Sequence, residues 1–245
     1  MRAVIIAGGL SKRLRPRTEN IPKTLLKLDE KIILEHILDS ARAGGIKHFE
    51  LLTGHGHDYV EGFMRLYKEH YPEITFDITY IDRYADTGNI IALEAGHHLF
   101  DDDIVIINSD TIFHQDIIKK LLANNDENAM IIDDVKELGE EEMKVLVDDN
   151  HIIYKIHKSL DPQSSHGEYV GVMKFGKNVQ PAMKESVSTL MAEDDSLYYE
   201  DAIQKMIDDS GIVINSVSTE GLPVMEIDTE EDLDEAKGLI KRILE

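Results

Sequence analysis

The sequence contains no cysteine among its 245 residues. This absence excludes disulfide bonds, thiolate metal sites and a cysteine nucleophile. A chain without disulfides also fits a reducing compartment, so we expect a cytoplasmic protein.

Long apolar segments are missing as well. No apolar run approaches the roughly 20 residues that a membrane-spanning helix needs, and Met1 and Arg2 lead into a run of strand length rather than into a signal peptide. We therefore expect no membrane partner. With 42% hydrophobic residues and no internal repeat or low-complexity linker, the chain can bury a full core, and we expect one domain over residues 1–245.

Positive charge is scarce and unevenly placed. The chain has 26 Lys and Arg against 48 Asp and Glu, a formal net charge of -22, which argues against a nucleic-acid partner. Residues 1–31 nevertheless hold eight basic residues and three acidic ones. A basic patch in an acidic protein predicts an anion-binding site there, although Arg2, Lys12 and Lys31 fit ordinary solvated surface.

The patch follows an apolar run, Ala3–Ala7, that is typical of the first, central strand of a parallel sheet. Gly8 and Gly9 come directly after it and let the backbone approach a ligand closely. Arg13 and Lys23 supply fixed positive charge where that ligand would lie. The segment therefore predicts a phosphate-binding loop at the end of a buried strand.

Strand and helix patterns alternate along the first half. Strands are predicted at 3–7, 49–53, 74–81 and 104–110, and helices at 32–41, 59–70 and 90–99. Alternation with short connections predicts an α/β fold: a doubly wound, Rossmann-like, mostly parallel sheet in three layers with flanking helices. Ligands bind at the carboxyl ends of such strands, and Gly8, Gly9, Thr53, Gly54 and Asp110 all fall at such ends.

The second half is less regular, and its short strands predict a sheet of mixed direction. Strands are expected at 129–135, 143–147, 152–156, 169–175, 212–217 and 224–227, and helices at 178–191, 199–209 and 228–244. Thr229 is the expected N-cap of the last helix. Three acidic runs, 101–103, 140–142 and 193–195, are interpreted as solvated loops rather than metal sites.

Two carboxylates stand apart from those runs. Asp110 ends a buried strand, where a carboxylate is costly unless it reaches a cleft or a cation. Asp228 ends the short strand at 224–227, and there it could pair with Asp110 to hold Mg2+. The alternative for Asp228 is a helix N-terminal residue favoured by the macrodipole.

These motifs together resemble the nucleoside-triphosphate transferases that activate sugar phosphates and alcohol phosphates. The segment Gly8–Thr18 with Pro22 and Lys23 resembles their signature loop, although Ser11 and Lys12 replace its second Gly and its Thr. The resemblance extends along nearly the whole chain through Asn108-Ser109-Asp110, Ile156-His157-Lys158, Gly167-Glu168-Tyr169-Val170-Gly171 and Glu226-Ile227-Asp228.

Within that family the chain is most similar to cytidylyltransferases acting on phosphocholine, inositol 1-phosphate or 2-aminoethylphosphonate. The segments that carry this likeness are 84–89, 142–145, 167–169 and 198–202. His157-Lys158-Ser159 also stands where sugar-1-phosphate enzymes often have Glu-Lys-Pro, which favours a non-sugar acceptor weakly.

The resemblance implies Mg2+-dependent transfer of a nucleoside monophosphate, CMP from CTP in the first instance, to a phosphorylated alcohol or phosphonate with release of pyrophosphate. It implies a nucleotide-binding half over 1–125 and an acceptor-binding half over 126–245. It also implies catalytic roles for Arg13, Lys23 and Lys158, and metal binding by Asp110 and Asp228. The nucleotide is expected to contact Ala7, Gly8, Gly9, Leu10, Lys23, Thr53, Gly54, Thr87, Gly88 and Asn89. The acceptor is expected to contact Lys144, Glu168, Tyr169, Glu200, Asp201 and Glu226.

Alternatives remain. One is a sugar-1-phosphate nucleotidyltransferase using UTP, dTTP or GTP, and another is an inactive nucleotide-sensing subunit, which should have lost Lys23 or a metal aspartate. A dinucleotide-dependent dehydrogenase is disfavoured, because the loop lacks the third glycine of its fingerprint. The acceptor and the oligomeric state stay open, with a homodimer as one option.

Overall fold

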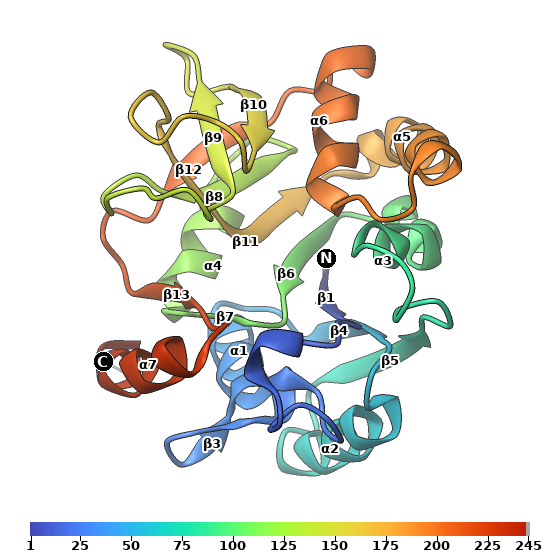
Figure 1. Ribbon diagram of the computed structural model, residues 1–245, viewed down its shortest axis with the longest axis vertical. Coiled ribbons are helices and arrows are strands. Elements are labelled where there is room, and N and C mark those ends of the chain that lie inside the picture. Colours follow the sequence, from blue (N-terminus) through green and yellow to red (C-terminus); the bar gives the residue numbers. More distant parts are fainter. Residues whose placement is uncertain (244–245) are drawn as a thin grey trace.

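The computed structural model describes residues 1–243, and its first half forms the parallel core of a sheet (Figure 1). β1 (Arg2–Ala7) lies between β4 (His48–Thr53) and β6 (Ile104–Asn108) and runs parallel to both. β5 (Thr75–Tyr80) continues the parallel order beyond β4. The prediction that the first apolar run is a central buried strand is confirmed.

The second half extends the same sheet with both antiparallel and parallel pairings. β11 (Gly167–Phe175) pairs antiparallel with β6 and so joins the two halves. Over the described residues nine strands form this sheet, the others being β8 (Ala129–Asp133), β9 (Lys144–Val147), β10 (Ile153–His157) and β12 (Asn215–Ser218). The predicted mixed, mostly parallel sheet is therefore confirmed.

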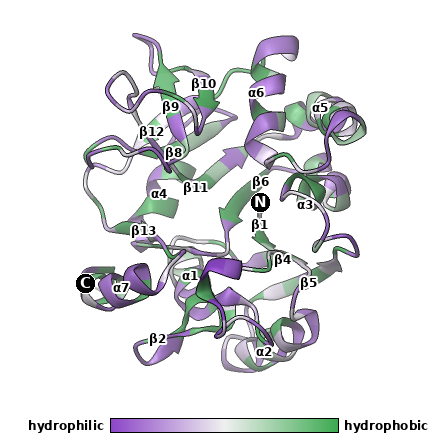
Figure 2. Ribbon diagram, viewed as in Figure 1, coloured by the Kyte–Doolittle hydropathy of each residue, from purple (hydrophilic) through white to green (hydrophobic). Residues whose placement is uncertain are grey.

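Side chains alternate between two apolar cores, one on each face of the sheet. In β1, Ala3 and Ile5 point into one core and Val4 into the other. The strands accordingly form a hydrophobic middle layer, green in Figure 2. The first core is covered by α1 (Ile33–Ala43), α2 (His57–His70), α4 (Gln115–Ala123) and α7 (Glu230–Ile243), and the second by α3 (Ile90–Ala95), α5 (Gln180–Glu193) and α6 (Tyr199–Ser210).

Two small antiparallel ladders lie outside the main sheet. β2 (Lys27–Leu28) pairs with β3 (Lys31–Ile32). β7 (Thr111–Phe113) pairs with β13 (Val224–Glu226), and this second ladder ties the C-terminal segment to the end of β6. No helix in residues 1–243 has the length and apolar character needed to cross a membrane.

The predicted elements differ from the observed ones mainly at their ends. The helix expected at 90–99 stops at Ala95, and a 3-10 turn over 97–101 follows Gly96. The strand expected at 212–217 begins at Asn215. The last helix begins at Glu230 rather than at 228, and Leu244 lies outside the described residues.

Candidate functional site

The loop after β1 folds back over the carboxyl end of the sheet. Leu14 anchors it in the core with no exposed surface. The Thr18 hydroxyl donates to the Ser11 carbonyl at 2.8 Å, and the His55 imidazole Nε2 lies 2.9 Å from the Thr18 carbonyl. These contacts hold the loop in one place and bring its cations, including Arg13, to the strand end.

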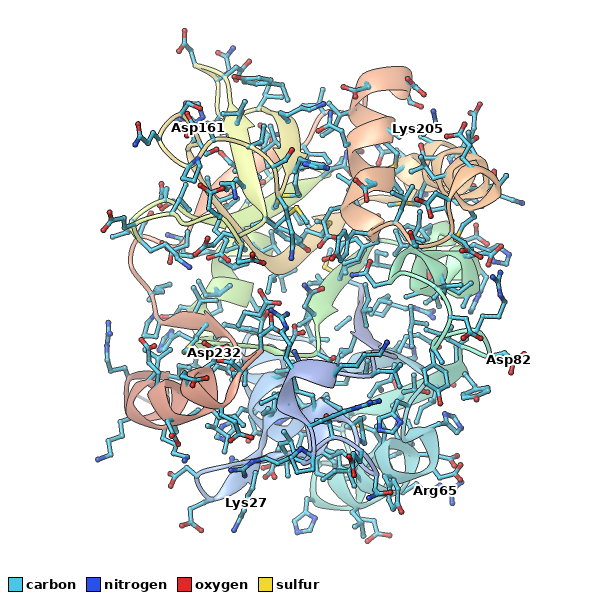
Figure 3. The ribbon with its side chains drawn as sticks, in the orientation of Figure 1. Lys27, Arg65, Asp82, Asp161, Lys205 and Asp232 are labelled. Atoms are coloured by element: carbon cyan, nitrogen blue, oxygen red, sulfur yellow. The ribbon has the colours of Figure 1, made fainter. Side chains whose placement is uncertain are left out.

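Asp110 and Asp228 lie side by side although 118 positions separate them in the sequence. Asp110 follows β6 and Asp228 follows β13, and the Ile227 backbone N–H donates to the Asp110 carbonyl at 2.9 Å. Asp232, labelled at the start of α7 in Figure 3, accepts from the backbone N–H groups of Asp228 at 2.9 Å and Thr229 at 2.7 Å. The β7–β13 ladder and this cap therefore fix Asp228 beside Asp110.

Thr229 fulfils its predicted capping role. Its hydroxyl accepts from the Asp232 backbone N–H at 3.2 Å, while the Asp232 carboxylate reaches back to the Thr229 N–H. This reciprocal pair is a capping box. Because Thr229 and Asp232 supply the helix cap, the Asp228 carboxylate is available to other partners. Both interpretations of Asp228, as a metal ligand and as a residue favoured by the helix dipole, stay predictions.

The loop cations meet both carboxylates. Lys23 Nζ lies 2.8 Å from Asp110 Oδ2 and 2.8 Å from Asp228 Oδ1, and Arg13 Nη2 lies 2.5 Å from Asp228 Oδ2. Burial opposes the charge on Lys23, but the two aspartates outweigh it and raise the pKa of Lys23. Burial likewise opposes the charge on Asp228, and Lys23 and Arg13 outweigh it and lower its pKa.

Glu226 adds a third carboxylate. Oxygens of Asp110, Glu226 and Asp228 all lie within 4.8 Å of one another. Desolvation in the cleft, with the charges of Asp110 and Asp228, raises the pKa of Glu226 to about 8. Asp110 Oδ1 is buried and has no hydrogen-bond partner. An all-oxygen set with a buried, unsatisfied oxygen fits a hard divalent cation such as Mg2+.

Two adjoining cavities open at this point. One, of about 350 Å³, extends over the glycine loop, and the other, of about 490 Å³, extends toward β11 and α6. Arg13 and Asp228 line both cavities. The charged cluster therefore lies at the junction between two binding spaces.

The smaller cavity is lined by the glycine loop after β1 and by the 84–92 segment. Its lining includes Gly8, Gly9, Leu10, Tyr84, Thr87, Gly88 and Asn89. A Cβ atom on Gly88 would lie 2.0 Å from the Leu197 carbonyl oxygen, so no larger residue fits there without displacement. This wall brings backbone close to whatever occupies the cavity.

The larger cavity is mostly acidic and tyrosine-lined. Its lining includes Ala7, Lys23, Glu141, Glu142, Lys158, Glu168, Tyr169, Tyr198, Glu200 and Glu226. Lys158 Nζ lies 5.2 Å above the Tyr198 ring. Burial raises the pKa of Glu168, against the opposing effect of Lys136, whose Nζ lies 2.8 Å from Glu168 Oε2.

Glu200 is the most buried carboxylate of this cavity. Its side chain is 6% exposed, and its Oε2 atom has no hydrogen-bond partner. Burial raises its pKa to about 7, against the opposing effects of its own backbone and of Tyr199. The Tyr199 hydroxyl donates to Asn108 Oδ1 at 2.9 Å and can accept from the Tyr169 hydroxyl, which also lies at 2.9 Å. A buried tyrosine network therefore lies beside a carboxylate that has one oxygen without a partner.

The structure places four of the predicted contact residues away from the two cavities. Thr53 is fully buried, with its hydroxyl 2.7 Å from His57 Nδ1, and Gly54 packs behind Gly8 and Tyr84. Both residues therefore lie behind the cavity wall, and their contact with the nucleotide stays a prediction.

The other two were predicted to contact the acceptor. Lys144 is fully buried, and its ammonium donates to the carbonyls of Gly139, Glu140 and Glu142 at 3.2, 2.8 and 3.1 Å. The Asp201 carboxylate accepts from the Tyr198 backbone N–H at 2.9 Å and so caps α6. Local backbone groups engage both charges, and direct contact of Lys144 or Asp201 with the acceptor stays a prediction.

Sequence reasoning missed other lining residues. Glu141 and Glu142 line the larger cavity, so the loop at 140–142, interpreted as solvated rather than as a metal site, also borders the candidate site. The available signal in the sequence was Lys144, a charged residue at the start of an apolar strand; in the structure its buried ammonium holds this loop in place. Tyr84 and Asn108 were overlooked as lining residues although both lie within motifs that were recognised.

Comparison with known proteins gives a family. The family described as MobA-like NTP transferase domain matches residues 3–172. The chain is 28% identical over 218 residues to the bifunctional protein GlmU of Methanocaldococcus jannaschii, covering 88% of this chain and 50% of that protein. It is 26% identical over 243 residues to the UTP--glucose-1-phosphate uridylyltransferase AglF of Haloferax volcanii, covering 97% and 95%.

A cytidylyltransferase is also similar over a shorter stretch. The choline-phosphate cytidylyltransferase of Streptococcus pneumoniae is 33% identical over 93 residues, 38% of each protein. The solved inositol-1-phosphate CTP transferase of T. maritima superposes with a TM-score of 0.83 at 22% identity, covering 100% of this chain and 96% of that one, and so shares the fold.

The chain spans about half the length of some of the curated relatives it matches. The match over residues 3–172 includes the glycine loop, Lys23, Asp110 and the joining strand β11 up to Val172, and therefore most of the site described above. The chain belongs to the family of MobA-like NTP transferase domains.

Proposed function

We propose that this protein is a Mg2+-dependent nucleotidyltransferase that transfers CMP from CTP to a small phosphorylated alcohol or a phosphonate, with release of pyrophosphate. The observation that carries the proposal is the meeting of Arg13 and Lys23 with Asp110 and Asp228 between two cavities. Cations suited to a triphosphate and carboxylates suited to a metal thus lie at one point, with room for a substrate on each side.

The smaller cavity is assigned to the nucleoside. Ala7, Gly8, Gly9, Leu10 and the 87–89 segment offer backbone edges to a base, and Arg13 and Lys23 bind the triphosphate beside it. Lys23 lies deepest and is assigned to the α-phosphate. The protein's part in the reaction is to align the two substrates and to balance the charge that develops during transfer.

Asp110 and Asp228 would hold the metal ion, and Glu226 lies close enough to join them. When bound, Mg2+ neutralises phosphate charge and orients the reacting oxygens. The chain itself needs no general base, because the attacking oxygen belongs to a phosphate or phosphonate that is already anionic. Lys158, on the wall of the larger cavity, is assigned to hold that anionic group.

The acidic lining supports an acceptor that carries a positive charge away from its phosphate. Glu141, Glu142, Glu168 and Glu200 line the larger cavity together with Lys158, and Tyr169 and Tyr198 add aromatic faces. Carboxylates and aromatic rings are the groups that bind amines and quaternary ammonium ions. Phosphocholine and 2-aminoethylphosphonate have this chemistry.

A sugar-1-phosphate nucleotidyltransferase is the second candidate. Its support is the uridylyltransferase AglF, which is similar over 97% of this chain, and carboxylates also bind sugar hydroxyls. An inactive nucleotide-sensing subunit has less support, since Lys23 and both aspartates are present.

A pyrophosphate-release assay tests these proposals. CTP, UTP, GTP, dTTP and ATP are crossed with phosphocholine, 2-aminoethylphosphonate, inositol 1-phosphate and several sugar 1-phosphates in the presence of Mg2+. We expect the strongest signal with CTP and a cationic acceptor. A signal confined to sugar 1-phosphates would support the second candidate, and silence across the grid would refute the enzymatic proposal.

Two substitutions and two matched controls complete the test. Lys23→Ala and Asp110→Ala should each lower kcat by about 10²- to 10³-fold, the typical loss when one preorganised charge is removed. Lys27→Ala and Asp149→Ala change the same residue types at exposed positions. Lys27 lies on the β2–β3 hairpin and points away from the site in Figure 3. Near-normal turnover in Lys23→Ala would remove the role assigned to that residue.

A further inference from the structure

The cations and the carboxylates of the site are engaged with each other. Lys23 takes one oxygen from each of Asp110 and Asp228, and Arg13 takes the second oxygen of Asp228. Of the four carboxylate oxygens of these two aspartates, only the buried Asp110 Oδ1 has no partner in the described part of the chain.

Each ion pair therefore occupies groups that two different ligands need. A triphosphate requires the ammonium of Lys23 and the guanidinium of Arg13, while a divalent cation requires the aspartates. Either ligand must break the same contacts before it can bind, and breaking them leaves the opposite set without a partner. Such unpaired charges in a partly buried site are costly, so they favour arrival of the second ligand.

We propose that Lys23 and Arg13 form an electrostatic interlock with Asp110 and Asp228. These ion pairs weaken the binding of the anion or the metal ion alone, and they make the binding of each ligand favour the binding of the other. The proposal rests on the proposed function for the identity of the anion, a triphosphate. Linkage makes the coupling reciprocal, and couplings of this kind change affinity by roughly five- to 150-fold.

The two cations contribute unequally. Lys23 is 8% exposed and contacts both aspartates, whereas Arg13 is 59% exposed and contacts one. Solvent screens the exposed pair more strongly. Lys23 is therefore the main element of the interlock, and removing Arg13 should have the smaller effect.

A neighbouring ion pair supplies matched controls. Arg17 Nε lies 2.7 Å from Glu230 Oε1, on the same loop and the same C-terminal segment, and does not contact Asp110 or Asp228. Arg17→Gln removes the same charge as Lys23→Gln, and Glu230→Gln removes the same charge as Asp228→Asn. These variants separate the interlock from a general change in electrostatic potential.

The first experiment measures binding of Mn2+ alone, by electron paramagnetic resonance of the free ion and without nucleotide. Lys23→Gln should bind Mn2+ roughly five- to 150-fold more tightly than the unmodified protein, and Arg13→Gln should show a smaller gain. Arg17→Gln should match the unmodified protein. Equal or weaker binding by Lys23→Gln, or an equal gain in Arg17→Gln, would overturn the proposal.

The second experiment measures binding of inorganic tripolyphosphate by calorimetry in the presence of a chelator. Asp228→Asn removes the charged partner of Arg13 and one of the two charged partners of Lys23, so it should bind the anion more tightly. Glu230→Gln should not. Circular dichroism confirms that each variant is folded, and the exposed Arg13→Gln keeps the first experiment decisive if Lys23→Gln is not folded.

Both experiments use single ligands and no transfer reaction. Silence in the pyrophosphate assay with tighter Mn2+ binding by Lys23→Gln would refute the proposed function and leave the interlock standing. Full activity with unchanged Mn2+ affinity would do the reverse.

Discussion

Replacing Glu200 by Gln should change how the stability of this protein depends on pH. Glu200 is buried, one of its oxygens has no partner, and burial raises its pKa from 4.5 to about 7. Because the folded state holds this proton more tightly than the unfolded state, Glu200 costs no stability below pH 4.5. Its cost grows as the pH rises from 4.5 and is complete above about 7.

The magnitude follows from the two pKa values. At 1.36 kcal/mol for each pKa unit, the change from 4.5 to about 7 corresponds to about 3 kcal/mol of unfolding free energy. Gln cannot ionise, so Glu200→Gln should gain about 3 kcal/mol relative to the unmodified protein between pH 4.5 and pH 8. In a chain of this length that gain amounts to roughly 6 to 12 °C in melting temperature.

The assay is urea unfolding of both proteins at pH 4.5, 6, 7 and 8. The informative quantity is the difference between the two proteins, because titration of the eleven histidines and any fixed effect of the amide cancel from its pH dependence. Glu69→Gln, at an exposed position on α2, is the matched control and should give a flat difference. A flat difference for Glu200→Gln as well would refute the reasoning.

Three further predictions concern the walls of the two cavities. Gly88→Ala places a Cβ atom 2.0 Å from the Leu197 carbonyl oxygen, so it should destabilise the fold by about 2 kcal/mol or more and weaken nucleotide binding, measured by thermal unfolding with and without CTP. Lys144→Met leaves three carbonyls of the 139–142 loop without their donor, so it should raise KM for the acceptor more than KM for the nucleotide in steady-state kinetics; equal changes would contradict a role in holding the acceptor wall. Asp232→Ala removes the cap that orients Asp228. It should lower the free energy of unfolding by about 1 kcal/mol in urea and weaken Mn2+ binding measured by calorimetry. Unchanged Mn2+ affinity would show that the β7–β13 ladder is sufficient to position Asp228.

The features that could be predicted from the sequence are those with a local signal. The apolar run at 3–7 has the composition of a buried strand, and the structure places it between β4 and β6. Asp110 could be expected at the carboxyl edge of the sheet, because it closely follows an apolar run of strand length. Short-range periodicity and the order of elements were enough for these assignments.

The features that could not be predicted depend on which partner a side chain finds. By residue type, Lys144 could bind an anionic group of a ligand and Asp201 a cationic one. In the structure, backbone carbonyls accept from the Lys144 ammonium, and the Tyr198 N–H donates to the Asp201 carboxylate. The acidic run at 140–142 has the composition of a solvated loop, and only the buried ammonium of Lys144 draws it against the cavity. No periodicity in the sequence encodes these contacts.

The position of Asp228 depends both on a local sequence motif and on tertiary contacts. Its motif marked it as a metal ligand, but its distance from Asp110 is set by β13, which pairs with β7 just beyond the end of β6. Lys23 reaches the same point from the opposite end of the chain, on a loop held by Leu14 and Thr18. Opposite charges brought together by independent elements neutralise each other, so the ligand-free site costs little electrostatic energy although it is partly buried. A ligand that separates the pairs must replace both sets of charges, and a metal–triphosphate complex carries both.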